Sequence, residues 1–237
     1  MATMKPYYET DLGKLYHGDC LSILPRLSNI DVIVTDPPFN VGKDFDNDNL
    51  SAKNFMAFCN RFALCLHDLS PLNIIVECGK QDTTMRYEIE RYFDFKYTLC
   101  LNYTNSMRQG SVGYANFGLI YWFSNKGKCY KRYKDRIDSP LRSTKKDFKH
   151  ESPKETQHYF KLVEMFSRSE HTICDPFLGS GTTAIVCEKL QRKWIGVESS
   201  EKYCEIAVRR IKQEADQLKL FQPCNNRMHR TPESWCL

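Results

Sequence analysis

The sequence predicts an α/β protein in which a mostly parallel sheet of seven strands carries helices on both faces. Two observations predict this class. Short apolar segments alternate with amphipathic ones along most of the 237 residues, and two of the apolar segments run directly into polar, turn-rich motifs. Such alternation is typical of strand–helix–strand units, whose strands lie parallel and whose crossover helices cover the sheet.

The expected strands are short apolar runs ended by turn residues. The run from Asp31 to Thr35 is rich in β-branched residues and stops before Pro37 and Pro38, which cannot continue a ladder. The seven strands are expected at residues 14–17, 31–35, 73–78, 96–103, 117–124, 171–176 and 194–198.

The expected helices carry apolar side chains at helical spacing. In the last of them, Tyr203, Ile206, Ala207 and Ile211 form one stripe, and charged residues occupy the rest of the surface. The helices are expected at residues 55–66, 83–92, 154–167, 180–190 and 201–218.

Length and composition allow one main domain. With 41% hydrophobic and 27% charged residues the composition is globular, and 237 residues are too few for two full domains. We expect a domain over residues 1–220, with a basic insert at about 125–150, and a loosely ordered tail over 221–237. No apolar run is long enough to span a bilayer, and no secretory signal begins the sequence, so a cytoplasmic protein without membrane contact is expected.

The chain has 11 cysteines, which raises the question of a metal site or a disulfide framework. No two cysteines have the C-x-x-C spacing typical of a zinc site, and several lie inside apolar runs, as Cys78 and Cys187 do. Cysteines of this kind behave as small buried hydrophobic residues. The sequence therefore predicts structural thiols and no metal.

Positive charge is concentrated in one segment. Residues 126–149 hold ten Lys and Arg against three Asp, and this excess of seven is larger than the net charge of +5 of the whole chain. The segment shows neither a helical nor a strand period. It is either a solvated loop or a surface that neutralises phosphates, and the interleaved Tyr130, Tyr133 and Phe148 favour the second interpretation.

The first motif is Asp36-Pro37-Pro38-Phe39, directly after the expected strand 31–35. In open parallel sheets the carboxyl ends of strands are where ligands gather. Two consecutive prolines fix a rigid turn, which would hold the Asp36 side chain and the Pro37 carbonyl as neighbouring acceptors beside an aromatic ring. Such a pair suits a planar amine with two N–H groups. The alternative is a strand-ending turn in which Asp36 only caps. Asn40 is expected to support the turn.

The second motif covers residues 175–183 and reads Asp-Pro-Phe-Leu-Gly-Ser-Gly-Thr-Thr, after another expected strand. A glycine-rich turn from strand to helix lets the backbone approach a ligand and aims amide donors at an anion. No lysine follows Gly181, which excludes a Walker A loop, and the third glycine of G-x-G-x-x-G is missing. Glu198 ends the next expected strand, where a carboxylate can take ribose hydroxyls. Loop and acid together indicate an adenosine-containing cofactor.

Taken together, these motifs resemble the amino-methyltransferases that modify exocyclic nitrogens of DNA bases. Their order, with the acidic tetrapeptide before the glycine loop, resembles the circularly permuted β group of that family. The segments 16–20, 150–154 and 198–211 resemble further parts of that group, so that the likeness covers residues 14–215. It implies the Rossmann-like fold of class I methyltransferases with permuted motif order, and S-adenosylmethionine as cofactor.

The resemblance implies a role for each motif residue. Asp36 and the Pro37 carbonyl would accept the N6 amine of an adenine flipped out of double-stranded DNA, and Phe39 would stack on the base. Asp19 would bind the adenine amine of the cofactor, Glu198 its ribose, and Lys154 its methionine end. The catalytic residues implied are Asp36, Pro37, Pro38 and Phe39. The cofactor-binding residues implied are Asp19, Lys154, Asp175, Phe177, Gly179, Ser180, Gly181, Thr182, Thr183 and Glu198.

The basic insert lies where the family reads DNA, which turns its charge into an expected phosphate-binding surface. The DNA-binding residues expected are Lys131, Arg132, Lys134, Arg136, Arg142, Lys145 and Lys146, of which the three arginines are the expected base readers. A second copy of the chain and a cognate restriction endonuclease are further partners that the resemblance allows.

Four alternatives stay open at the level of the sequence. The substrate could be RNA, because flipped or single-stranded bases look alike to the pocket. The same scaffold could methylate cytosine N4, although the tetrapeptide of such enzymes more often begins with Ser. The fold could belong to a non-catalytic DNA-binding regulator, against which the intact Asp36 and glycine loop argue. A nicotinamide-dependent oxidoreductase is disfavoured by the missing third glycine.

Overall fold

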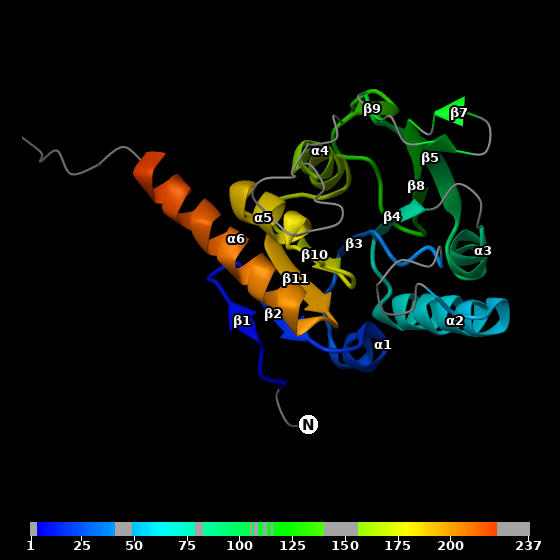
Figure 1. The fold of residues 1–237 in the computed structure, drawn as a ribbon, viewed down its shortest axis with the longest axis horizontal. Helices are drawn as coiled ribbons and strands as arrows, with labels where there is room; N and C mark the ends of the chain where they lie inside the picture. The colour runs from blue at the N-terminus through cyan, green and yellow to red at the C-terminus, as the bar shows by residue number, and fades with distance from the viewer. Residues whose placement is uncertain are drawn as a thin grey trace, which may run out of the picture.

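A mixed sheet of nine strands forms the centre of the computed structural model, in the order β1-β2-β11-β10-β3-β4-β8-β5-β9 (Figure 1). The structure describes residues 4–40, 49–78, 83–104, 106, 109–110, 113–114, 116–139 and 156–221. The sheet strands are β1 (Tyr8–Glu9), β2 (Gly13–His17), β3 (Val32–Thr35), β4 (Asn73–Cys78), β5 (Phe95–Asn102), β8 (Phe117–Phe123), β9 (Arg136–Asp138), β10 (Thr172–Asp175) and β11 (Lys193–Glu198). Strands β1 and β8 run antiparallel to the rest.

The expected fold class is confirmed. The seven expected strands are β2, β3, β4, β5, β8, β10 and β11, and they adjoin one another in the sheet. The short strands β1 and β9 extend the two edges, and they lack the apolar runs by which the other strands were predicted. Strand β9 lies in the basic insert, where no strand was expected, and pairs with β5 from Cys100 to Asn102.

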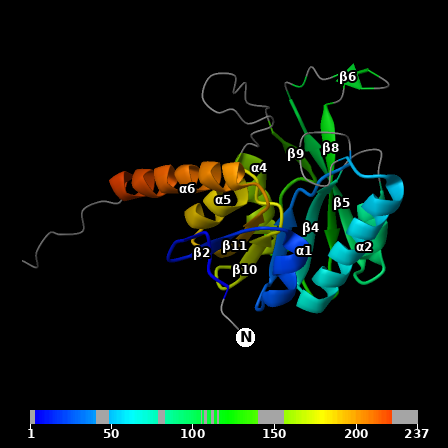
Figure 2. The ribbon, with the colours of Figure 1, turned by 60° about the horizontal axis from the view of Figure 1, so that its bottom comes forward.

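Helices cover both faces of the sheet (Figure 2). On one face lie α1 (Cys20–Ile23), α2 (Ala52–Leu69) and α3 (Thr84–Glu90), and on the other lie α4 (Thr156–Phe166), α5 (Thr182–Lys189) and α6 (Glu201–Phe221). A turn of 3₁₀ helix, Leu24–Arg26, follows α1. Sequence patterning did not predict α1, because four residues are too few to show a period.

Two cores result from the alternation of side chains along the strands. On β3, Val32 and Val34 pack under α4 to α6, whereas Ile33 packs under α1 to α3. Side chains of a strand point to opposite faces in turn, so a fully apolar strand supplies both cores at once. This explains why the buried strands β3 and β4 are nearly continuous apolar runs.

A small hairpin, β6 (Gln109–Gly110) and β7 (Gly113–Tyr114), connects β5 to β8. Strand β5 ends at Asn102 and β8 begins at Phe117, so the hairpin lies beyond the edge at which the parallel strands end. Figure 2 shows it standing clear of the ends of β8 and β9.

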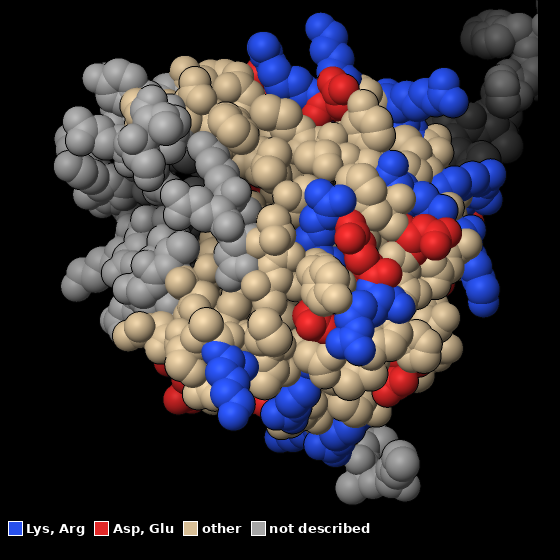
Figure 3. Space-filling view, turned by 90° about the vertical axis from the view of Figure 1, so that its right-hand side faces the viewer, with Lys and Arg blue, Asp and Glu red and all other residues tan. Residues whose placement is uncertain are grey.

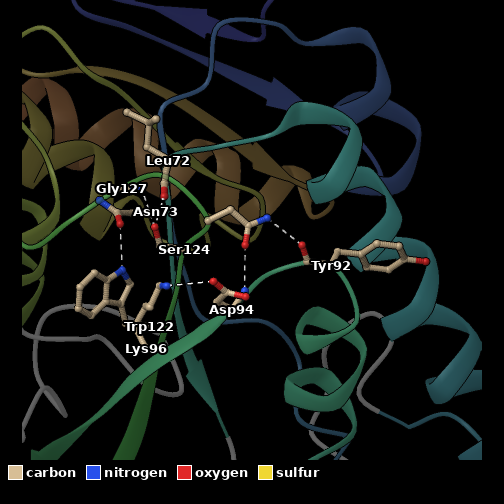
Figure 4. Close-up of polar contacts among 9 residues, drawn as sticks. Leu72, Asn73, Tyr92, Asp94, Lys96, Trp122, Ser124 and Gly127 are labelled. Carbon is tan, nitrogen blue, oxygen red and sulfur yellow. Dashed lines mark hydrogen bonds and ion pairs between the residues drawn. The ribbon is translucent and has the colours of Figure 1, made fainter.

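Polar contacts fasten the opposite edge, where the parallel strands begin (Figure 4). The Leu72 carbonyl, just before β4, accepts from the Gly127 amide (3.1 Å) and the Ser124 hydroxyl (2.8 Å). The indole Nε1 of Trp122 donates to Asn73 Oδ1 at 2.9 Å. The basic insert therefore starts at the amino edge of the sheet.

The cysteines within the described part of the chain are free thiols. The nine cysteines within the described residues are free, and six of them are buried. Burial raises the pKa of Cys204 to about 12 and that of Cys174 well above its usual range, so these thiols stay protonated. Among the described residues no cluster of three or more His, Cys, Asp or Glu is arranged to hold a metal. None of the helices described there is long and apolar enough to cross a membrane.

Candidate active site

Both sequence motifs lie at the carboxyl edge of the parallel strands. Asp36 follows β3, Asp175 is the last residue of β10, and Glu198 is the last residue of β11. Strand β10 lies between β3 and β11, with Ile173 paired to Val32 and Asp175 paired to Gly196. Residues far apart in the chain are thereby gathered at one edge, as expected of a doubly wound sheet.

A buried hydrogen bond joins the two motifs directly. The hydroxyl of Thr35, the last residue of β3, donates to Asp175 Oδ1 at 2.7 Å across 140 positions of sequence. Thr183 donates to Asp175 Oδ2 at 2.5 Å, and the Phe177 amide donates to Oδ1 at 3.1 Å. Asp175 is only 3% exposed. Its carboxylate therefore ties the Asp36 turn, the glycine loop and the first turn of α5 together.

The glycine loop is held against α6. Gly181 has φ +86, and a Cβ there would come within 3.0 Å of the Ala207 side chain. A side chain would therefore be strained in its backbone and crowded against the helix. Arg210 of α6 donates to the Ser180 carbonyl and hydroxyl, both at 2.6 Å. The glycine loop is therefore fixed in place by its contacts with α6.

Glu198 and Asp19 stand beside that loop. Glu198 is 9% exposed, and its carboxylate accepts from the Gly179 amide at 2.7 Å and the Ser200 amide at 2.8 Å. The Gly18 amide donates to the Glu198 carbonyl at 2.9 Å, which brings the next residue, Asp19, to the same edge. Asp19 also caps α1, since its Oδ1 accepts from the Leu21 amide at 3.1 Å. Asp19 therefore both caps α1 and lies at the same sheet edge as Glu198.

The ring of Phe177 packs against α2. Its ring lies 5.3 Å from Phe62 and 6.0 Å from Phe58, measured between ring centroids. It is only partly buried, so it covers the core of that face at the same edge as the glycine loop.

The acidic tetrapeptide forms a turn with buried and half-buried parts. Pro37 is buried, whereas Asp36 and Phe39 are half-buried, and the Oδ1 atom of Asp36 is itself buried. Asn40 adopts φ +55 and binds both backbone groups of Leu50, donating to its carbonyl at 3.0 Å and accepting from its amide at 2.7 Å. Asn40 therefore supports the turn, as expected.

Three polar residues that were not predicted from the sequence lie in the region of Asp36. Tyr159 of α4 is buried, and burial raises the pKa of its hydroxyl well above its usual range, with the charges of Asp36, Glu77 and Asp175 adding to the effect. Glu77 of β4 and His158 of α4 lie in the same buried region. An acid inside the apolar run of residues 73–78 was the signal that could have drawn attention to Glu77.

The described part of the basic insert runs from the amino edge of the sheet along α4 to β9. Lys131 pairs with Glu164 of α4 at 2.7 Å, and Arg136 pairs with Asp138 at 3.1 Å. Arg132 and Lys134 are exposed. Figure 3 shows Lys and Arg side chains next to Asp and Glu on the face that carries β5 and α3, rather than one continuous positive surface. The expected residues Arg142, Lys145, Lys146 and Lys154 lie outside the described residues.

The protein is therefore an α/β protein that has a glycine-rich loop and an acidic tetrapeptide at the same edge of its sheet. A loop of this kind is typical of proteins that bind an adenosine-containing cofactor. The family model described as DNA methylase, of the N6/N4 group, matches residues 30–209. The chain belongs to this DNA methylase family. Because the order of the two motifs is read directly from the chain, the acidic tetrapeptide precedes the glycine loop within the matched region.

Named relatives and solved structures agree with this family. The chain is 28% identical to the type II methyltransferase M.BamHI of Bacillus amyloliquefaciens, over 92% of this chain and 61% of that protein. It therefore spans less than two thirds of that relative. It is also 28% identical to M.ScaI of Streptomyces caespitosus, over 90% of this chain and 86% of that protein.

The fold is shared with solved DNA methyltransferases. PvuII DNA methyltransferase, described as cytosine-N4-specific, superposes with a TM-score of 0.72 at 17% identity, over 92% of this chain and 96% of that one. M1.HpyAVI in complex with SAM superposes with a TM-score of 0.63 at 22% identity, over 84% of this chain and 100% of that one.

Proposed function

We propose that this protein transfers a methyl group from S-adenosylmethionine to the N6 amine of adenine in double-stranded DNA. The observation that carries the proposal is the hydrogen bond from Thr35 to Asp175, which holds the Asp36 turn beside the glycine loop. An amine acceptor and a methyl donor must meet in line at near-attack distance, so two binding elements fixed to each other are what the reaction requires.

The residues around the glycine loop fit an adenosine cofactor with a charged tail. Glu198 presents a carboxylate suited to ribose hydroxyls, and Asp19, one strand away, is suited to the adenine amine. Gly179 and Gly181 let the backbone come close, and the start of α5 at Thr182 and Thr183 favours a carboxylate. Lys154 is proposed for the methionine end. The cofactor supplies an electrophilic methyl group when bound.

Within this set, Asp175 acts through the loop rather than on the cofactor. Its two carboxylate oxygens accept from Thr35, Thr183 and the Phe177 amide, so it is a positioning residue. The Thr183 hydroxyl donates to Asp175, which leaves the backbone N–H groups of the first turn of α5 as the proposed donors to the cofactor carboxylate.

Asp36 and Pro37 prepare the acceptor. The lone pair of an exocyclic amine is delocalised into the base, which makes the nitrogen a poor nucleophile. When the Asp36 carboxylate and the Pro37 carbonyl accept its two N–H bonds, the nitrogen moves toward tetrahedral geometry and its lone pair becomes available. The same carboxylate stabilises the positive charge that develops on the nitrogen.

The base has to leave the duplex to reach this turn. Flipping costs a few kcal/mol, and Phe39 is the proposed stacking surface, worth about 1–3 kcal/mol. The phosphates are proposed to bind the basic insert, with Arg132, Lys134 and Arg136 among its exposed described cations. We further propose that residues 1–220 form one catalytic domain, and that a second copy or a cognate endonuclease acts with it. Of the tail expected over 221–237, all but Phe221, which ends α6, lies outside the described residues.

Cytosine N4 is the competing acceptor, because it presents the same two N–H groups. The Asp at the start of the tetrapeptide favours adenine, since the cytosine-modifying enzymes that the sequence resembles more often have Ser. A nucleoside digest of DNA incubated with the protein and S-adenosylmethionine, analysed by mass, distinguishes them. We expect N6-methyladenine. N4-methylcytosine alone would overturn the choice of base, and no methylated base on any DNA would overturn the function.

A further inference from the structure

Asp36 has a second carboxylate as its neighbour on the next strand. The register of β3 and β4 pairs Val34 with Ile75 and Thr35 with Val76, so Asp36 and Glu77 occupy the next pair of positions. Val34 and Ile75 both belong to the core under α4, and side chains two residues further along a strand point to the same face. Asp36 and Glu77 therefore point together toward α4.

Asp175 completes a row of three acids on this face. Strand β3 lies between β10 and β4 in the sheet. Asp175 is the last residue of β10, Asp36 directly follows β3, and Glu77 is the last residue but one of β4. All three act on the buried hydroxyl of Tyr159, whose pKa burial and their charges raise. The three carboxylates thus converge on one place beneath the first turns of α4.

Glu77 is held in this place from two sides. The Tyr103 hydroxyl donates to Glu77 Oε1 at 3.0 Å, and Glu77 Oε2 faces His158 Nε2 at 4.0 Å. The side chains of His158 and Glu77 are only 2% and 7% exposed. On its other side, His158 Nδ1 lies 3.2 Å from the Ser139 hydroxyl, at the end of β9. Four elements (β4, β5, β9 and α4) enclose the Glu77–His158 pair.

The arrangement poses an electrostatic problem for the acceptor turn. Neighbouring strands lie about 4.8 Å apart, and carboxylates at paired positions of two such strands disfavour each other's ionised form where water is partly excluded. A protonated Asp36 could not both accept a hydrogen bond from the amine and stabilise the positive charge that develops on the amine nitrogen. The charge of Glu77 therefore acts against the charge of Asp36.

We propose that His158 is protonated and forms a buried ion pair with Glu77, which keeps Asp36 ionised for the reaction. This inference rests on the proposed function of Asp36. Glu77 and His158 are positioning residues, since they act through Asp36 and do not touch the base. Among the described residues, the titratable and polar groups that face the pair include Asp36 after β3, Tyr103 after β5, Ser139 after β9, Tyr159 on α4 and Asp175 on β10.

The direct test is the protonation state of His158, followed by NMR of the imidazole nitrogens. The chain has six histidines, and the spectrum of His158→Gln assigns the signal by difference. We expect His158 to remain an imidazolium at pH 7.5 in the wild type and to become neutral there in Glu77→Gln, because burial without a partner disfavours the charge. A neutral His158 at pH 7.5 in the wild type overturns the proposal.

The second test follows methyl transfer in single turnovers from pH 5 to 9. In His158→Gln, Glu77 loses the positive charge of His158 and its own negative charge acts on Asp36. The acidic limb of the pH–rate profile is therefore expected to move up by about one pH unit. In the double variant Glu77→Gln/His158→Gln both charges are gone, and the limb is expected to return close to the wild-type position. A merely structural pair would give additive losses without this return, and that result contradicts the proposal.

His171→Gln is the matched control. His171 is also buried, but it lies just before β10 at the amino edge and contacts Tyr130. The acidic limb of the pH–rate profile of His171→Gln is expected to match that of the wild type. Calorimetric binding of S-adenosylmethionine shows that each variant is folded. If wild-type protein binds cofactor but methylates no DNA, the proposed function fails, whereas the imidazole spectrum still decides the ion pair.

Discussion

Replacing Thr35 by Val tests the junction between the two halves of the site. Valine keeps the shape of the side chain but cannot donate to Asp175, whose carboxylate is 3% exposed. A hydrogen bond to a charged group contributes about 1.5–3 kcal/mol, so Thr35→Val is expected to lower the free energy of unfolding by that amount. For a chain of this length the loss corresponds to a decrease in Tm of roughly 3–12 °C.

Thr35→Val is expected to affect the rate of methyl transfer more than the free energy of unfolding. The bond fixes the Asp36 turn relative to the glycine loop, and small misplacements of reacting groups are costly, so the single-turnover rate of methyl transfer is expected to fall about 10- to 100-fold. The matched control is Thr98→Val, the same change on half-buried β5, away from the junction. Thermal denaturation and single-turnover transfer measure both effects. Equal Tm values and equal rates for the two variants would refute the role of the bond.

Three further predictions concern the loop and the insert. Gly181→Ala is expected to destabilise the protein by about 1–3 kcal/mol in urea denaturation, because φ +86 and the Ala207 contact at 3.0 Å both oppose a Cβ; unchanged stability would contradict this. Glu198→Gln should weaken S-adenosylmethionine binding roughly 10-fold or more by calorimetry, since its charge is lost; wild-type affinity would exclude Glu198 from the cofactor site. Burial alone would raise the pKa of Glu164, but hydrogen bonds from Lys131 and Tyr133 outweigh it and lower that pKa. The stabilisation is therefore present at neutral pH and lost as the pH falls, so Glu164→Gln should destabilise by about 1 kcal/mol or less at pH 7 and by less near pH 4; an equal loss at both pH values would count against it.

The sequence was sufficient to predict the parts of the fold that depend on local patterns. The β-branched run ending at Thr35 and the stripe along α6 each reflect one element packing on one core, and both were predicted correctly. The edge strands β1 and β9 were missed because two or three residues at a sheet edge need no apolar run. They pair through backbone hydrogen bonds, which leave little mark on the residues.

The site was predictable where its motifs are contiguous and obscure where partners come from distant elements. The tetrapeptide and the glycine loop could be read from the sequence, but the hydroxyl of Thr35 gained its meaning only from Asp175, 140 positions away. In the same way, Glu77 and His158 come together only because β4 and α4 pack against each other. The charge of the insert was evident in the sequence, whereas its ion pair with Glu164 was not.

The central claim is that Asp36 accepts the amine of the target base. The most direct measurement is transfer of labelled methyl from S-adenosylmethionine to DNA by the wild type and by Asp36→Ala, with cofactor binding determined in parallel. We expect the wild type to label DNA and the variant to bind the cofactor normally while losing activity by about 10²-fold or more, because the group that stabilises the developing charge is gone. Transfer at a wild-type rate by Asp36→Ala would contradict the account.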